Sequence, residues 1–82
     1  MNKNQKVELL KYSSPYSILV VGYDDKLMEL RCPFKVEVRE SFGSEIKGEI
    51  LDVNKVLLSE RLTVIFQINN RQYHHYHFHI VI

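Results

Sequence analysis

Apolar and polar residues alternate at every second position through much of this chain. The segment 34–39, FKVEVR, alternates apolar with charged residues, and the segment 62–68, LTVIFQI, repeats the alternation with a richer apolar content. A β-strand turns successive side chains to opposite faces, whereas a helix distributes the same residues around its circumference. Each segment therefore predicts a strand with one buried and one solvated face.

The C-terminal third predicts a β-hairpin over residues 62–81. Its turn falls at Asn69-Asn70-Arg71, and asparagine tolerates the positive φ that tight hairpin turns require. The second strand of this hairpin is expected to run from 72 to 82, with one face formed by Tyr76, Phe78, Ile80 and Ile82.

The N-terminal third predicts further strands. The segment 16–23, YSILVVGY, is apolar on both faces, Asp24-Asp25 is expected to turn the chain, and 26–31 is the returning strand. The segment 6–11 fits either a helical turn or an edge strand, and we favour the strand. Glycines at 43 and 48 predict a wide turn over 41–50, and residues 57–61 are expected to form a longer connection.

These elements predict an all-β chain of about six or seven short strands. The turn signals recur at the spacing that is typical of sandwiches and barrels. With 82 residues, 45% of them hydrophobic, the chain is expected to form one domain over residues 1–82, in which 1–5 are a disordered N-terminal tail. Because closure hides sheet edges, we predict a small antiparallel barrel or barrel-like sandwich.

The region from Phe34 to Ile80 resembles the small SH3-like barrels. The resemblance is carried by Val36 and Val38, by the segments 42–44 (FGS) and 46–50 (IKGEI), by Val53, and by the hairpin 64–78. It implies an SH3-like barrel with a glycine-bearing turn before a bent strand. It also implies a binding or architectural module rather than an enzyme, an inference that is analogy at the level of the fold. The N-terminal strands are not explained by it.

The net charge of the chain and the absence of known catalytic motifs argue against several classes of function. Eleven Lys and Arg against ten Asp and Glu give a net charge of +1, which provides no steering field for nucleic acid or anionic lipid. The sequence has no serine elbow, phosphate loop or HExxH motif, so we expect no enzyme and no cofactor. The single Cys32 forms no internal disulfide, and the polar start and the short apolar runs favour a cytoplasmic protein without a membrane partner.

The segment 73–79, YHHYHFH, is the most distinctive in the chain. On a continuous strand, His75, His77 and His79 would share one face, about 6.5–7 Å apart. Imidazoles at this spacing are able to converge on Zn, Ni or Cu, and they also form pH-sensitive surfaces. The alternative, which we favour, is that they are solvent-facing residues that alternate with the core side chains of the same strand.

The preferred functional hypothesis is a non-enzymatic interaction module that binds a protein partner or associates with itself as a homo-oligomer. If Ile18 and Val20 face the core, then Leu19, Val21 and Tyr23 form an apolar stripe outside, and exposed apolar patches usually mark contacts. A nucleic-acid-binding barrel is the alternative, with tyrosines as stacking platforms beside Lys35 and Arg39, although Glu37 lies between these two cations.

Overall fold

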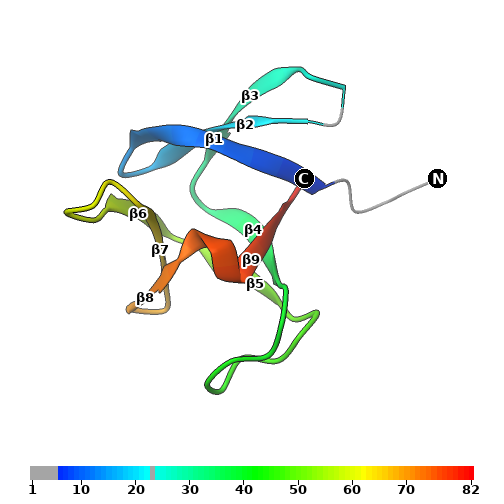
Figure 1. Cartoon of the computed structure of the whole chain (residues 1–82), viewed down its shortest axis with the longest axis vertical. Coiled ribbons are helices and arrows are strands. Elements are labelled where there is room, and N and C mark those ends of the chain that lie inside the picture. Colours follow the sequence, from blue (N-terminus) through cyan, green and yellow to red (C-terminus); the bar gives the residue numbers. More distant parts are fainter. Residues whose placement is uncertain (1–5, 23) are drawn as a thin grey trace.

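The computed structural model describes residues 6–22 and 24–82. Within these residues the chain forms nine strands and one 3₁₀-helix, and no α-helix (Figure 1). The elements are β1 (Lys6–Ser14), β2 (Ser17–Val21), β3 (Leu27–Arg31), β4 (Phe34–Val38), β5 (Ile50–Val53), β6 (Lys55–Leu58), β7 (Val64–Ile68), β8 (Arg71–His74), η1 (His75–His77) and β9 (Phe78–Val81). The predicted all-β antiparallel class is confirmed, with more strands than the six or seven expected.

The first three strands form an antiparallel meander. Strand β2 pairs with β1 on one side and with β3 on the other, and Val20 lies opposite both Leu9 and Met28. The turn predicted at Asp24-Asp25 is confirmed, because Asp25 has a φ of 64° and its N–H donates to the Gly22 carbonyl at 2.9 Å. The strand preferred for residues 6–11 is also confirmed. It contains a register shift between Leu9 and Lys11, which marks an irregularity of the β-bulge type at Leu10.

The remaining strands follow a path that returns to its start. Strand β4 pairs with β5, and β5 leads past Asn54 into β6. Strands β6, β7 and β8 form a three-stranded sheet, after which η1 leads into β9 and β9 pairs with β4. The last strand of residues 34–81 therefore returns to pair with the first, with Val36 opposite Ile80.

The N-terminal meander extends this path into a curled six-stranded sheet, in the order β3-β2-β1-β9-β4-β5. The junction is short, because β1 pairs with β9 only at Lys6 and Val7 within the described residues. A second link lies at the β1–β2 turn, where the Pro15 carbonyl accepts a 2.7 Å hydrogen bond from the Val56 N–H of β6. These two links hold β1 alongside η1 and the β6–β7 turn.

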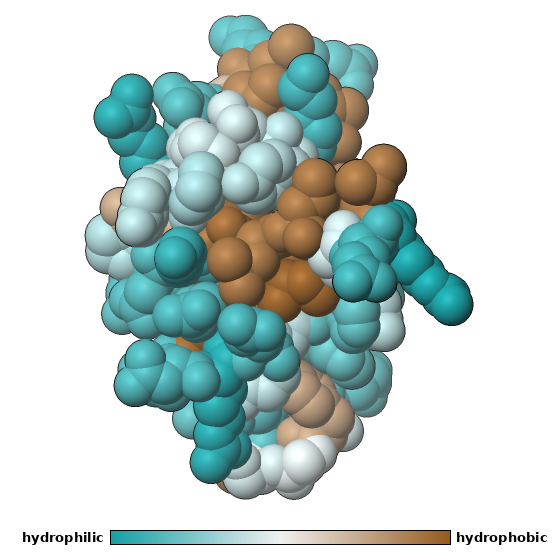
Figure 2. Space-filling view, turned by 90° about the vertical axis from the view of Figure 1, so that its left-hand side faces the viewer, coloured by the Kyte–Doolittle hydropathy of each residue, from teal (hydrophilic) through white to brown (hydrophobic). Residues whose placement is uncertain are grey.

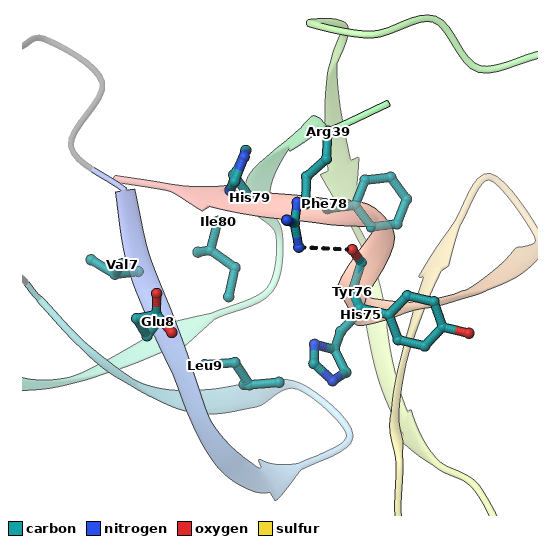
Figure 3. A pocket seen from close by; sticks show the side chains of 9 residues that line it. All are labelled: Val7, Glu8, Leu9, Arg39, His75, Tyr76, Phe78, His79 and Ile80. Atoms are coloured by element: carbon teal, nitrogen blue, oxygen red, sulfur yellow. Dashed lines mark hydrogen bonds between the residues drawn. The ribbon is translucent and has the colours of Figure 1, made fainter. Parts of the chain in front are cut away.

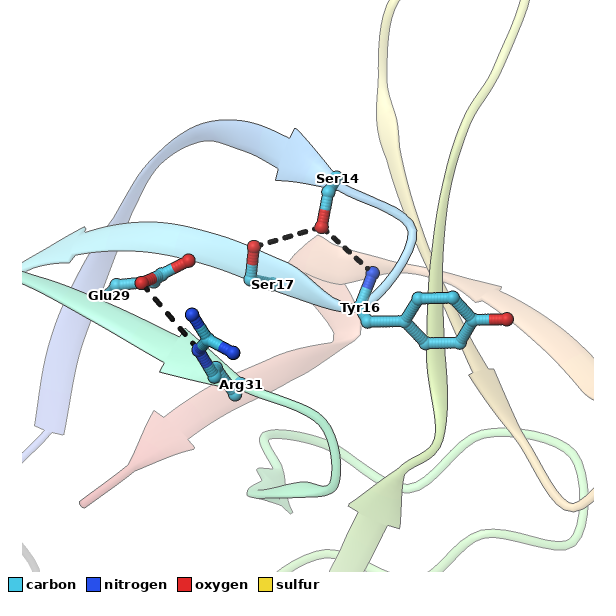
Figure 4. A network of polar contacts seen from close by, with 5 residues as sticks. All are labelled: Ser14, Tyr16, Ser17, Glu29 and Arg31. Carbon is cyan, nitrogen blue, oxygen red and sulfur yellow. Dashed lines mark hydrogen bonds and ion pairs between the residues drawn. The ribbon is translucent and has the colours of Figure 1, made fainter.

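The β1–β2 turn has its own polar network (Figure 4). The Ser14 hydroxyl is hydrogen-bonded to the Ser17 hydroxyl at 2.9 Å and accepts from the Tyr16 N–H at 3.1 Å. Ser17 is buried, so this bond satisfies its polar group inside the protein. Next to it, on β3, Arg31 and Glu29 form an ion pair at 3.7 Å.

One apolar core runs through both parts of the chain. Ile18 and Val20 of the meander are fully buried, as are Val36 of β4 and Phe66 of β7, and all belong to the same cluster. The Phe34 and Phe66 rings meet edge-to-face with centroids 5.4 Å apart, an arrangement that aromatic quadrupoles favour. The alternation in β4 and β7 thus has the predicted outcome, with every second side chain buried.

Two predicted elements are wrong. Residues 57–61 are not all connection, because β6 extends to Leu58 and its Val56 is fully buried opposite Phe66. The predicted continuous strand 72–82 is interrupted by η1. The interruption has a topological cause, since β8 pairs with β7 whereas β9 must reach β4 in the other sheet.

Candidate functional site

The histidine row does not form the candidate metal site, which was the less favoured of the two interpretations of the sequence. Because His75–His77 is a turn of 3₁₀-helix, the imidazoles of His75, His77 and His79 do not share a strand face. The His77 ring stacks on Phe42 with centroids 4.2 Å apart, and the His74 ring stacks on Tyr76. Among the residues described, no group of three or more His, Cys, Asp or Glu side chains is arranged to hold a metal ion. The prediction fails because it required an uninterrupted strand.

His77 instead helps to anchor the loop between β4 and β5. Phe42 in this loop contacts both His77 and Tyr73, and the Tyr73 hydroxyl donates to the Glu45 carboxylate at 3.0 Å. The two loop glycines have positive φ, as the predicted wide turn requires. This cluster accounts for His77 by packing rather than by ligand chemistry.

His75 has a different environment, because its ring lies half-buried between β1 and β7. Its centroid is 6.4 Å from that of Phe66. Burial lowers the pKa of His75 below its ordinary value of 6.5, and the neighbouring charge of His74 lowers it further. The neutral imidazole is therefore the form that the fold favours.

This shift predicts a pH dependence of stability. Below pH 6.5 the unfolded chain binds a proton at residue 75 more readily than the folded chain does. The contribution of the neutral His75 side chain to the free energy of unfolding is thus complete above pH 6.5. It declines as the pH falls through the lowered pKa. We expect His75→Gln to flatten the slope of unfolding free energy against pH in urea titrations between about pH 7 and 5. An unchanged slope would contradict this assignment.

A hollow of about 240 Å³ opens where β1 and β9 cease to pair (Figure 3). Its β1 wall carries Glu8 and Leu9, and its opposite wall carries His75 and Arg39. The Arg39 Nη1 atom donates to the Tyr76 carbonyl at 3.4 Å, which holds the guanidinium over η1. The full lining is Val7, Glu8, Leu9, Arg39, His75, Tyr76, Phe78, His79 and Ile80.

A second hollow, of about 510 Å³, continues along the same strand. It shares Leu9 and His75 with the first and is lined by Leu9, Leu10, Lys11, Tyr12, Leu58, Leu62, Thr63, Val64 and His75. We call the two together the β1 groove. It follows β1 from Val7 to Tyr12, a length of roughly 17 Å at the rise of a strand.

Three exposed leucines line this groove. Leu10 is 51% exposed, Leu58 42% and Leu62 74%, and all three line the larger hollow. Viewed from the side that holds the β1–β2 and β6–β7 turns, the molecule shows an apolar area at the centre of the face, bordered by hydrophilic residues (Figure 2). The three leucines therefore form an exposed apolar patch, a feature that is common at the contact surfaces of soluble proteins.

Leu62 also has a strained backbone. Its φ is 63°, in the left-handed region that glycine and asparagine adopt more readily. The conformation is fixed by the turn, because the Leu62 N–H donates to the Ser59 carbonyl at 2.8 Å and the Ser59 N–H donates to the Thr63 carbonyl at 2.9 Å. A leucine that is both strained and exposed does not serve the stability of the isolated chain, and such features concentrate at functional sites.

The interaction stripe predicted from the sequence lies elsewhere. Leu19 and Val21 alternate with the buried Ile18 and Val20 as expected, but both are half-buried, and Tyr23 lies outside the described residues. Sequence reasoning did not identify the three groove leucines. The consecutive Leu9-Leu10 pair, which breaks the alternation, was the available signal for Leu10. The sequence held no such signal for Leu62, because the identity of a leucine in a turn does not indicate that its φ is positive.

The remaining candidate groups have structural roles. The Cys32 thiol is free and half-buried, and burial raises its pKa, which opposes formation of a nucleophilic thiolate. The Asp24 carboxylate accepts from the Lys26 N–H at 3.2 Å and so stabilises its own turn.

Within the described residues, the chain has no helix of the length and hydrophobicity that a membrane crossing requires. Comparison of the chain with protein-family models, with curated proteins and with solved structures found no match.

Proposed function

We propose that this chain is a non-enzymatic, cytoplasmic interaction module that binds protein through the β1 groove. The observation that carries the proposal is the gathering of three exposed leucines, one of them backbone-strained, around a continuous groove. Because only 42–74% of each leucine is still exposed, its burial in a complex contributes roughly 0.6–2 kcal/mol. Together the three leucines supply the apolar area that the centre of a small interface requires.

The proposal includes an SH3-like barrel over residues 34–81. In support of it, the last strand of this region returns to pair with the first, and the glycine-bearing loop precedes the bent β5–β6 segment. The N-terminal meander is an addition that supplies one wall of the groove. The binding surface is thus built from both parts of the chain.

The first test is Leu62→Asn. Asparagine adopts positive φ at lower cost, and the leucine side chain is already 74% exposed. We therefore expect the free energy of unfolding to rise by about 0.5–1 kcal/mol, measured by urea denaturation. In affinity capture from native extract, the same variant is expected to lose the proteins that the wild-type chain retains, because it removes the most exposed apolar side chain of the groove.

Leu27→Thr is the matched control. Leu27 is 64% exposed on β3 and does not line the groove, and threonine suits a strand. This variant should retain the proteins that the Leu62 variant loses. Loss of the same proteins from both variants, or from neither, would count against the groove.

A further inference from the structure

We infer that the partner in the β1 groove is a second copy of this chain, docked about a two-fold axis with the two β1 strands antiparallel. In this arrangement Glu8 of each copy faces Lys11 of the other, and Leu10 lies close to the axis. The leucines around the larger hollow of each copy are covered by the smaller-hollow end of the other. The inference rests on the proposed function and names the partner.

The segment 8–11, ELLK, has the symmetry that such a pairing requires. Its two ends carry opposite charges and its centre carries two leucines. A two-fold axis through that centre exchanges the ends of the segment, so every charge meets its opposite. Parallel copies would instead place like charges together.

Both charged residues occupy suitable positions in the fold. Glu8 and Lys11 are exposed on β1 on either side of the Leu10 irregularity. Glu8 lines the smaller hollow and Lys11 lines the larger one, so they mark opposite ends of the β1 groove. The leucines at positions 10, 58 and 62 surround the larger hollow, and a two-fold contact buries two sets of them at once.

The charges of the groove also bear on the choice of partner. The charged side chains that line the two hollows are Glu8, Arg39 and Lys11, so a strongly basic segment laid along the groove would be repelled by the two cations. The chain as a whole carries a net charge of only +1, so two copies approach without appreciable repulsion. A surface that carries both signs is able to complement its own two-fold image, as the segment 8–11 does.

The test is sedimentation of the purified chain and of three charge variants. The wild type is expected to show a reversible monomer–dimer equilibrium, at moderate salt and concentrations up to about 1 mM. Glu8→Lys and Lys11→Glu each create two like-charge pairs across the axis, and each alone is expected to weaken dimerisation about tenfold. Lys26→Glu is the control, because it changes the net charge as Lys11→Glu does but lies in the β2–β3 turn outside the groove.

The decisive sample is an equimolar mixture of Glu8→Lys and Lys11→Glu chains. Two basic positions of one copy then face two acidic positions of the other, so a heterodimer of about wild-type affinity is expected, and the double variant should likewise dimerise normally. Circular dichroism of each variant verifies that it is folded. Leu62→Asn should remain monomeric.

Two results would overturn the inference. A wild-type chain that sediments as a monomer throughout would exclude the second copy as partner, while groove-dependent capture of other proteins would leave the proposed function standing. If the chain dimerises but neither charge reversal weakens the dimer and the mixture does not restore it, self-association takes place on another surface. Loss of both self-association and groove-dependent capture would refute the proposed function as well.

Discussion

Replacement of Phe66 by alanine is expected to remove about 3–5 kcal/mol from the free energy of unfolding. Phe66 is fully buried and its ring meets those of Phe34 and Phe78, with centroid separations of 5.4 and 6.2 Å. Truncation leaves a cavity between aromatic rings that the surrounding strands are unable to close. A domain of this size has a total stability of roughly 4–12 kcal/mol, so the substitution removes a large share of it and should lower the urea midpoint strongly.

Urea denaturation followed by far-ultraviolet circular dichroism measures this effect. Ile65→Ala is the matched control, because Ile65 is the neighbour of Phe66 on β7 but lies half-buried on the other face. The control should lose clearly less stability than the Phe66 variant. Equal transition midpoints for the two variants would show that the observed alternation along β7 does not define the core.

The alternation of the sequence predicts strands β4 and β7 correctly. Strands β4 and β7 bury the side chains that the pattern assigns to the inner face. The same reasoning failed over residues 75–77, where the alternation continues but the chain leaves β7 to pair with β4. A change of sheet depends on where distant strands lie, and the local pattern carries no information on that.

The candidate site was less predictable than the fold for the same reason. Its walls come from β1 and from the β6–β7 turn, which are about fifty residues apart in the chain. Exposure of Leu58 and Leu62 follows from how these segments are placed rather than from their neighbours in sequence. The histidines, by contrast, were conspicuous in the sequence, and the structure gives His77 a packing role against Phe42.

Replacement of Ile18 by alanine is expected to cost about 2–5 kcal/mol and to destabilise the whole chain, not the N-terminal meander alone. Ile18 has no exposed surface and belongs to the same core cluster as Phe66 and Val36 of residues 34–81. The Pro15 carbonyl at the β1–β2 turn also accepts a hydrogen bond from the Val56 N–H of β6. If the meander unfolds, this N–H donor loses its partner. A shared core and a shared hydrogen bond make the two parts one cooperative unit.

Histidine resonances in the proton NMR spectrum report on the C-terminal part, because all four histidines lie between residues 74 and 79. Far-ultraviolet circular dichroism reports on the strands of both parts. For Ile18→Ala, the histidine resonances and the circular dichroism should both change at the same urea concentration, which is lower than that of the wild type. Leu19→Ala is the control, because Leu19 lies on the half-buried face of β2, and it should lower the urea midpoint less. If the histidine resonances kept their native positions after part of the dichroism was lost, the meander would be a separable addition. The β1 groove would then depend on a docking equilibrium between two units, because one of its walls is β1 itself.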